Sequence, residues 1–393
     1  MTDRLERAGR IAPELIALRR EIHRHPELGR TEWRTAERVE RELHALGIET
    51  ARIAETGVIG TLRGERPGRC VALRADMDAL PMQEETGLPF ASENAGIMHA
   101  CGHDLHVAAL LGAARLLASE RETLCGSVHF FFQPDEEGDG GARRMIEAGC
   151  MDGVDAVFGA HVAPELPTGT IGVRPGKAYA ASNPFDVVVR GRSAHGAEPH
   201  LGADAIVAAS SIVVALQSLV SRNVSPLDSA VISVGSFHAG TARNILADEA
   251  RLSGILRCFG STMRHKLSNR IRQAVEGVAA SMGVEAEVQI QWGYDGIIND
   301  LAMTERVCQS AAKLIGAANV TEEVSPSLTT EDFGAFLECA PGSYWHIGVG
   351  KRGADNPPLH NPRFDPDESA IALAAAIHAQ IAVDFLEKAG GKA

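Results

Sequence analysis

The chain has 393 residues, 45% of them hydrophobic and 23% charged, which is enough for roughly two or three folded domains with large apolar cores. Its 38 Lys and Arg residues against 51 Asp and Glu give a net charge of −13, and no basic run follows a phosphate backbone, so nucleic acid is excluded as an expected partner. The N-terminus lacks a continuous apolar segment, and we find no apolar run of the roughly 18 residues that span a bilayer. We therefore expect a cytoplasmic protein with no membrane partner.

The first predicted element is an amphipathic helix over residues 31–46, where Trp33, Val39 and Leu43 recur at helical spacing. Between residues 70 and 162, short apolar runs then alternate with helical stretches. The predicted strands are 70–76, 127–132 and 155–162, and the predicted helices are 103–120 and 141–149. This alternation indicates an α/β fold in which helices cover a mostly parallel sheet, with the ligand site beyond the carboxyl ends of the strands.

A different order of elements begins at Phe185. Strands at 185–191, 230–240, 249–259 and 284–292 and helices at 203–220 and 263–283 give the order β-α-β-β-α-β, which is the ferredoxin-like unit. We therefore expect an inserted domain over residues 183–293, within a discontinuous catalytic domain formed by 1–182 and 294–393. After the insertion the alternation resumes with a helix at 300–316, a strand at 344–350 and a final helix at 368–390.

Acids and an imidazole follow three of the predicted strands at the point where each strand ends. They are Asp76 and Asp78, then Asp135, Glu136 and Glu137, then His161. On a turn that leaves a strand, one of the adjacent carboxylates Glu136 and Glu137 can face a metal while the other faces a substrate. The structural alternative is an acidic pair that simply favours the start of a helix.

The segment 98–106, MHACGHDLH, places a thiol and an imidazole two residues apart. Cys101 and His103 can both reach one divalent ion, and Gly102 allows a tight turn between them. The alternative is a buried cysteine beside Asp104 acting as a helix cap. The seven cysteines are odd in number and never in CxxC spacing, which argues against a disulfide framework. Further candidate ligands at predicted strand ends and loops favour the metal site: Glu137, His161 and His360.

The chain resembles the M20 metallopeptidase and amidohydrolase family, in its branch of hippurate hydrolases, N-acyl-amino-acid amidohydrolases and plant auxin-conjugate hydrolases. The resemblance covers nearly the whole chain. It rests on LRREIHRHPELG, LRADMDALPMQEETGLPFAS, MHACGHDLHVAALLGAA, FFFQPDEEGDGGARRMIEAG, GAHVAPELPTGTIGV, AHGAEPHLGADAI, ARNILAD, EDFGAFLE and HNPRFD. Several of these motifs are individually specific, and their order is the order of the family.

The resemblance implies two divalent metal ions per subunit, with manganese or zinc as the first candidates and cobalt or nickel as the others. The implied ligands are Cys101, His103, Glu137, His161 and His360. Glu136 corresponds to the catalytic base, which takes a proton from a water that the metals ionise and passes it to the leaving amine. Asp78 matches a position that backs a metal-ligating imidazole.

The resemblance also implies that the inserted domain is a lid and dimerisation domain in a homodimer or higher homo-oligomer. His195 matches a histidine that reaches into the neighbouring subunit's site and helps to stabilise the oxyanion. Asn244 and Arg257 match groups near the substrate carboxylate. The structural alternatives are turn residues for His195 and Asn244 and a strand-surface cation for Arg257. NILAD and GILRCF depart from the family's NVIPD and GTxRT, which leaves the substrate open.

Our leading hypothesis is a binuclear metal-dependent amidohydrolase that cleaves N-acyl amino acids, hippurate-like or N-acetylated, to a carboxylic acid and a free amino acid. N-acetyl-diaminopimelate deacetylation and aminobenzoyl-glutamate hydrolysis are alternatives of the same kind. A different class, a metal-independent cysteine hydrolase, would use Cys101 as nucleophile with His103 or His106 as base. A metal-binding protein without activity is disfavoured because Glu136 is intact and is not needed as a ligand.

Overall fold

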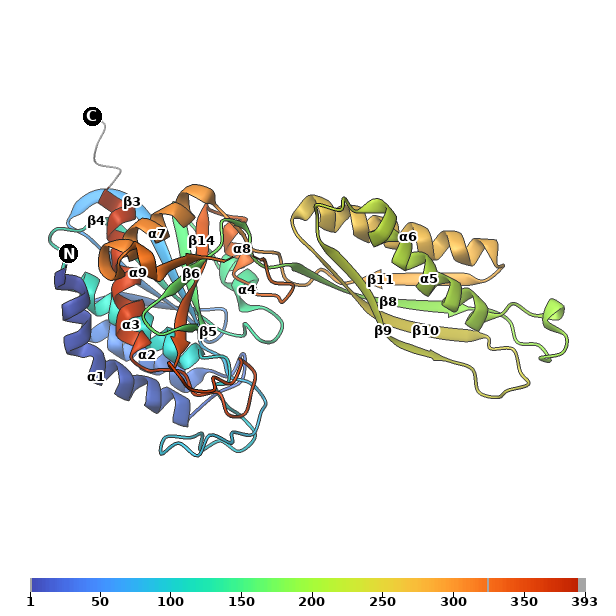
Figure 1. Ribbon diagram of the computed structural model, residues 1–393, viewed down its shortest axis with the longest axis horizontal. Helices are drawn as coiled ribbons and strands as arrows, with labels where there is room; N and C mark the ends of the chain where they lie inside the picture. Colours follow the sequence, from blue (N-terminus) through green and yellow to red (C-terminus); the bar gives the residue numbers. More distant parts are fainter. Residues whose placement is uncertain (1, 324, 388–393) are drawn as a thin grey trace. The chain divides into compact units, whose positions relative to one another are not determined.

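The computed structural model describes residues 2–323 and 325–387 and divides the chain into two compact units (Figure 1). The first unit runs over Met1–Gly176, Asn299–Ser325 and Asp332–Ala393, and the second over Lys177–Ile298 and Pro326–Glu331. The second unit is therefore wider than the expected 183–293. The first strand of its four-stranded sheet begins at Ala181, before the expected start, and the Ser182 N–H donates to the carbonyl of Tyr294, beyond the expected end, at 2.9 Å.

An eight-stranded sheet in the order β1-β2-β4-β3-β5-β14-β6-β13 forms the centre of the first unit. Its strands are β1 (Glu49–Ile53), β2 (Gly57–Arg63), β3 (Arg66–Asp76), β4 (Cys125–Gln133), β5 (Ala156–Pro167), β6 (Ile171–Val173), β13 (Val320–Glu322) and β14 (Gly342–Gly350). The central neighbours β4, β3, β5 and β14 pair in parallel. Strands β1, β2 and β6 add antiparallel pairs. The predicted α/β class with a mostly parallel sheet is confirmed.

The helices of this unit are α1 (Thr2–Arg24), α2 (Trp33–Ala45), α3 (His103–Ala118), α4 (Gly141–Glu147), α7 (Leu301–Ile315), α8 (Gly334–Leu337) and α9 (Ala370–Glu387). Helix α1 and strands β1 and β2 were not predicted. Residues 388–390 of the predicted final helix lie outside the described residues. Helices α1, α3 and α9 pack closely at Gly112, where a Cβ would lie 2.7 Å from Leu15 Cδ1 and 2.8 Å from Ala375 Cβ.

The second unit holds a four-stranded antiparallel sheet in the order β11-β8-β10-β9. Its elements are β8 (Ala181–Arg190), α5 (Ala205–Asn223), β9 (Ala230–Ala239), β10 (Glu249–Cys258), α6 (Ser261–Ser281) and β11 (Glu285–Ile290), in the predicted β-α-β-β-α-β order. The short strands β7 (Gly176–Lys177) and β12 (Ile298–Asn299) pair at the boundary of the units, and single 3-10 turns form at Pro199–Leu201 and Ala317–Asn319. A separate apolar core fills the space between the sheet and α5 and α6.

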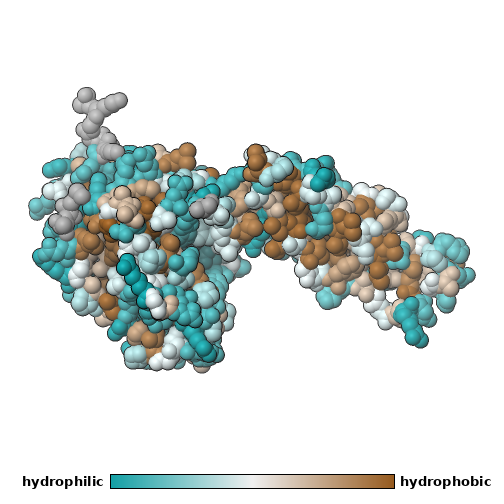
Figure 2. Space-filling model, viewed as in Figure 1, coloured by the Kyte–Doolittle hydropathy of each residue, from teal (hydrophilic) through white to brown (hydrophobic). Residues whose placement is uncertain are grey.

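Among the residues that the structure describes, two helices are as long and apolar as a membrane-spanning helix, which we did not expect from the sequence. By length and composition alone, α5 (19 residues, mean hydropathy 1.6) and α9 (18 residues, mean hydropathy 1.5) could cross a membrane. Helix α9 is a core helix, since 83% of it is buried in the fold. Helix α5 buries one face on its sheet and leaves Ile206, Val207 and Val214 exposed. Figure 2 shows apolar side chains gathered over the helices of this unit.

Candidate metal centre

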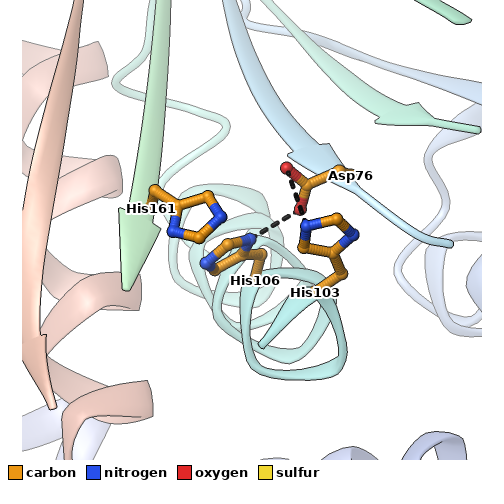
Figure 3. A group of neighbouring side chains, drawn as sticks. All are labelled: Asp76, His103, His106 and His161. Carbon is orange, nitrogen blue, oxygen red and sulfur yellow. Dashed lines mark hydrogen bonds and ion pairs between the residues drawn. The ribbon is translucent and has the colours of Figure 1, made fainter. Parts of the chain in front are cut away.

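The polar residues of the site come from neighbouring parallel strands and from the start of one helix. Strand β3 ends at Asp76, β5 carries His161, and α3 begins at His103. Figure 3 shows these side chains and His106 turned toward one another. We expected His161 at a strand end, but β5 continues to Pro167 because it pairs with β14 beyond this position.

A glycine in the left-handed conformation brings Cys101 and His103 to the same place. Gly102 has a φ of 87° immediately before α3. A Cβ on Gly102 would lie 2.6 Å from Val162 Cγ2, so the turn is also packed tightly against β5. Both side chains are buried.

Two imidazoles are fixed by their Nδ1 atoms and turn their Nε2 atoms inward. His103 Nδ1 donates to the Asp78 carbonyl at 2.9 Å, and His161 Nδ1 donates to the Val162 carbonyl at 2.9 Å. A carbonyl only accepts, so each ring carries its proton on Nδ1 and keeps a lone pair on Nε2 when neutral. His161 Nε2 lies 3.4 Å from Cys101 Sγ. His103 Nε2 is buried and has no hydrogen-bond partner among the described residues.

The five predicted ligands come together around these nitrogens. One ligand atom each from Cys101, His103 and Glu137 lie within 4.8 Å of one another. His360 Nε2 lies 3.0 Å from Glu137 Oε1, and the Glu137 backbone N–H donates to Asp78 Oδ2 at 2.9 Å. Asp78 also places Oδ1 3.4 Å from His103 Nδ1, so it contacts two of the predicted ligands, His103 and Glu137.

The electrostatics of the cluster favour a cation. Burial lowers the pKa of His103, but the negative charges of Asp76, Asp78 and Glu137 outweigh it and raise this pKa to about 10. Burial and the charges of Glu137 and Glu136 raise the pKa of the Cys101 thiol well above its usual value. Sulfur, nitrogen and oxygen donors around a buried nitrogen that lacks a partner fit a divalent transition ion.

His106 and Asp76 lie beside the cluster, and their nitrogen and oxygen atoms already make hydrogen bonds. His106 Nδ1 bonds to Asp76 Oδ1 at 2.6 Å, and His106 Nε2 accepts the Val162 N–H at 3.0 Å. Arg74 holds the other Asp76 oxygen at 2.6 Å. Although Asp76 and His106 fall within 4.8 Å of His103 and His161, they brace the site.

Glu136 is buried on the loop between β4 and α4, next to Glu137. A carboxylate oxygen of Glu136 lies within 4.8 Å of one of Asp332. Asp332 accepts from Gln133 Nε2 at 2.8 Å and from the Ala142 N–H at 3.0 Å, so it joins the two ends of the loop. We assigned no role to Asp332 or Gln133 from the sequence, although both lie in motifs that carry the family resemblance.

Three predicted residues belong to the second unit. His195 and Asn244 are exposed and lie on adjacent loops, where the Gly196 N–H donates to the Asn244 carbonyl at 2.9 Å. Arg257 lies elsewhere on this unit, because it is opposite Ser182 at the start of β8, while His195 follows the end of β8. Arg257 is half-buried, and its Nη1 has no hydrogen-bond partner among the described residues.

The sequence matches a known family over most of its length. Residues 72–384 match peptidase family M20/M25/M40. The chain belongs to this family. As a member of M20/M25/M40 it is a metal-binding enzyme, a hydrolase of amide carbon–nitrogen bonds.

Curated relatives and solved structures agree with this assignment. The chain is 42% identical over 363 residues to N-acetyl-L-cysteine deacetylase of Bacillus subtilis, covering 92% of this chain and 86% of the relative. It is 38% identical to N-acetyldiaminopimelate deacetylase of a Geobacillus species, covering 91% and 94%. The crystal structure of Bacillus subtilis YxeP, described as a dinuclear metal-binding peptidase of family M20, matches with a TM-score of 0.84 and 37% identity over 96% of this chain and 99% of YxeP.

The geometry disfavours the cysteine-hydrolase alternative. Reactive thiols are partly exposed and have a lowered pKa, whereas Cys101 is buried and its pKa is raised. Burial and the charge of His106 hold the pKa of His161, the imidazole beside the thiol, well below its usual value, so His161 is not a cation that would stabilise a thiolate. All seven cysteines are free, and only Cys339 is exposed.

Proposed function

We propose that this M20 enzyme is a binuclear metal-dependent amidohydrolase that cleaves N-acyl amino acids to a carboxylic acid and a free amino acid. The observation that carries the proposal is a cluster of thiol, imidazole and carboxylate groups beside Glu136, whose buried carboxylate the cluster does not need. The names of the deacetylase relatives support an acylated amino acid as substrate. We place the reaction in the cytoplasm.

Cys101, His103, Glu137, His161 and His360 would hold two divalent ions, with manganese or zinc as the first candidates. The ions would act as Lewis acids that polarise the substrate carbonyl and lower the pKa of a water molecule. The protein prepares the ligands in advance, because Asp78 and the Val162 carbonyl fix the tautomers of His103 and His161.

Glu136 is the proposed general base and acid. Its carboxylate would accept a proton from the attacking water at one oxygen and deliver it to the amide nitrogen as the carbon–nitrogen bond breaks. Burial protects this proton transfer from bulk water, since Glu136 is only 6% exposed. Glu137, the next residue, contacts His360 through its side chain and Asp78 through its backbone N–H, and these contacts hold it toward the proposed metal ligands.

The second unit would recognise the substrate and the partner subunit. Arg257 Nη1 is buried and has no hydrogen-bond partner in the described part of the chain, and it would donate to the substrate carboxylate, with Asn244 as a further polar group. We assign His195 to oxyanion stabilisation in the site of a neighbouring subunit. A homodimer or higher homo-oligomer fits the exposed apolar side chains of α5 at Ile206, Val207 and Val214.

The test is activity of metal-stripped protein before and after addition of zinc or manganese, with N-acetyl amino acids, hippurate, N-acetyl-diaminopimelate and aminobenzoyl-glutamate as substrates. We expect loss of turnover on chelation and recovery on metal addition, with release of a free amino acid from at least one substrate. Turnover that is indifferent to metal would refute the proposal. The preferred substrate in the panel then separates N-acetyl amino acids from the alternatives.

A further inference from the structure

The loop between β4 and α4 contains a strained residue immediately before the proposed base. Asp135 has a φ of 55°, in the left-handed region that residues other than glycine rarely adopt. Strained backbone persists only where the surrounding structure holds it, and it concentrates at functional sites. The conformation at Asp135 sets the direction in which the chain continues into Glu136 and Glu137.

Three contacts hold Asp135 in this conformation. Its backbone N–H donates to Glu32 Oε1 at 2.9 Å, and its carbonyl accepts the Gly141 N–H at 3.0 Å. Its side-chain Oδ2 forms an ion pair with Arg144. Two of these partners lie within nine residues of Asp135, whereas Glu32 lies 103 residues away in the sequence.

Glu32 belongs to a segment between α1 and α2 that is built against the loop. Glu32 is fully buried, and its second oxygen accepts the Thr56 hydroxyl at 2.6 Å. The segment approaches so closely that a Cβ on Gly29 would lie 2.0 Å from Asp135 Oδ1. It is fixed in turn to the residues after β3, because the Ala79 N–H donates to the Glu27 carbonyl at 2.8 Å.

We propose that Glu32 is a positioning residue for Glu136: it holds the Asp135 N–H so that Asp135 stays left-handed and the adjacent Glu136 and Glu137 face different partners. The inference rests on the proposed function, in which Glu136 is the base and Glu137 a ligand. Glu32 contacts neither residue and acts through the backbone of Asp135. Glu32 lies in the expected helix over residues 31–46, where we gave it no role.

The experiment compares three variants with the wild type, all as full-length, metal-loaded enzyme. Glu32→Gln keeps an oxygen that can accept the Asp135 N–H. Glu32→Asp keeps a carboxyl group but withdraws its oxygens from the Asp135 N–H, and Glu32→Leu removes the carboxyl group. Glu27→Ala is the matched control, because Glu27 lies on the same segment and accepts the Arg34 and Thr35 N–H groups at the start of α2 but does not contact Asp135.

The first readout is hydrogen–deuterium exchange of peptides that cover residues 134–140. We expect faster exchange there in Glu32→Asp and Glu32→Leu, and exchange close to wild type in Glu32→Gln and Glu27→Ala. The second readout is kinetic: kcat should fall roughly tenfold to a hundredfold in the Asp and Leu variants, while KM and bound metal stay near wild type. Wild-type exchange and kcat in Glu32→Gln would show that the hydrogen-bonding oxygen matters for positioning. Glu27→Ala shows how far general destabilisation of the segment changes the same two readouts.

Unchanged exchange and kcat in Glu32→Asp, or a Gln variant as impaired as the Leu variant, would overturn the inference. Failure of the proposed function would look different. In that case Glu136→Gln would retain turnover, while the exchange of residues 134–140 would still report whether Glu32 holds the loop.

Discussion

Substitution of Asp104 tests whether a buried ion cluster fixes the start of α3, the helix that begins with His103. Asp104 Oδ2 lies 2.6 Å from Arg19 Nε and 2.8 Å from His23 Nδ1, and all three side chains are fully buried. Removing one member of a buried charge pair leaves the other uncompensated, which typically lowers the free energy of unfolding by about 3–5 kcal/mol. We expect a loss of this size in Asp104→Asn.

The assay is urea unfolding of metal-free protein, followed by tryptophan fluorescence. Trp345 is fully buried in the first unit and reports its unfolding. Arg20→Gln is the control, because Arg20 pairs with Glu368 from a side chain that is 45% exposed, and such pairs contribute at most about 1 kcal/mol. If Asp104→Asn were no less stable than Arg20→Gln, the cluster would not be a major source of stability and this reasoning would be refuted.

The same cluster predicts a dependence on pH. Burial raises the pKa of Asp104, but the charges of Arg19 and His23 outweigh it and hold this pKa far below its usual range. A carboxyl whose pKa is lower in the folded state stabilises the fold above the unfolded pKa, which is about 4, and loses this effect as the pH falls below it. Asp104→Asn should therefore differ most from wild type at neutral pH and progressively less in acid.

Three further predictions address separate parts of the account. Iodoacetamide should modify the exposed Cys339 and leave the buried Cys101 unmodified, as peptide mass spectrometry would show, and turnover should be retained. Loss of activity in step with modification of Cys101 would instead support Cys101 as a nucleophile. Val214→Asp, at a position 72% exposed on α5, should shift sedimentation toward the monomer with little change in unfolding, and an unaltered oligomer would exclude this face as the interface. Burial raises the pKa of Glu32 to about 7, so the free energy of unfolding should fall as the pH rises from about 4 to 7. Glu32→Gln should remove this dependence on pH. The same dependence in the wild type and the variant would contradict the prediction.

The strands and helices between residues 70 and 162 could be predicted because their apolar runs are short, regular and separated by turn residues. Helix α1 could not, because its 23 residues mix apolar and charged side chains and include Pro13. The local sequence pattern also did not predict where β5 ends, because pairing with β14 extends this strand past His161. Pairing partners are a property of the fold and leave no local signal.

Some residues of the candidate site could likewise be predicted from the sequence, and others could not. Cys101 and His103 are two residues apart in the sequence, and their spacing indicated a metal site once Glu137, His161 and His360 were found at predicted strand ends and loops. Glu32 gave no such signal, because only the fold brings it to Asp135, and the polar segment RTEWRT does not indicate a buried carboxylate. His106 shows the opposite problem: its residue type suits a metal or a catalytic base, but Asp76 and the Val162 N–H already occupy both of its nitrogens.

The most direct test of the central claim is a side-by-side measurement of bound metal and turnover in wild type and Glu136→Gln. We expect two divalent ions per subunit in both proteins, with turnover lost by a factor of at least about a hundred in the variant, because only the proton transfer is removed. Retained turnover would exclude Glu136 as the base. Loss of metal together with turnover would instead make Glu136 a ligand and would contradict the division of roles between Glu136 and Glu137.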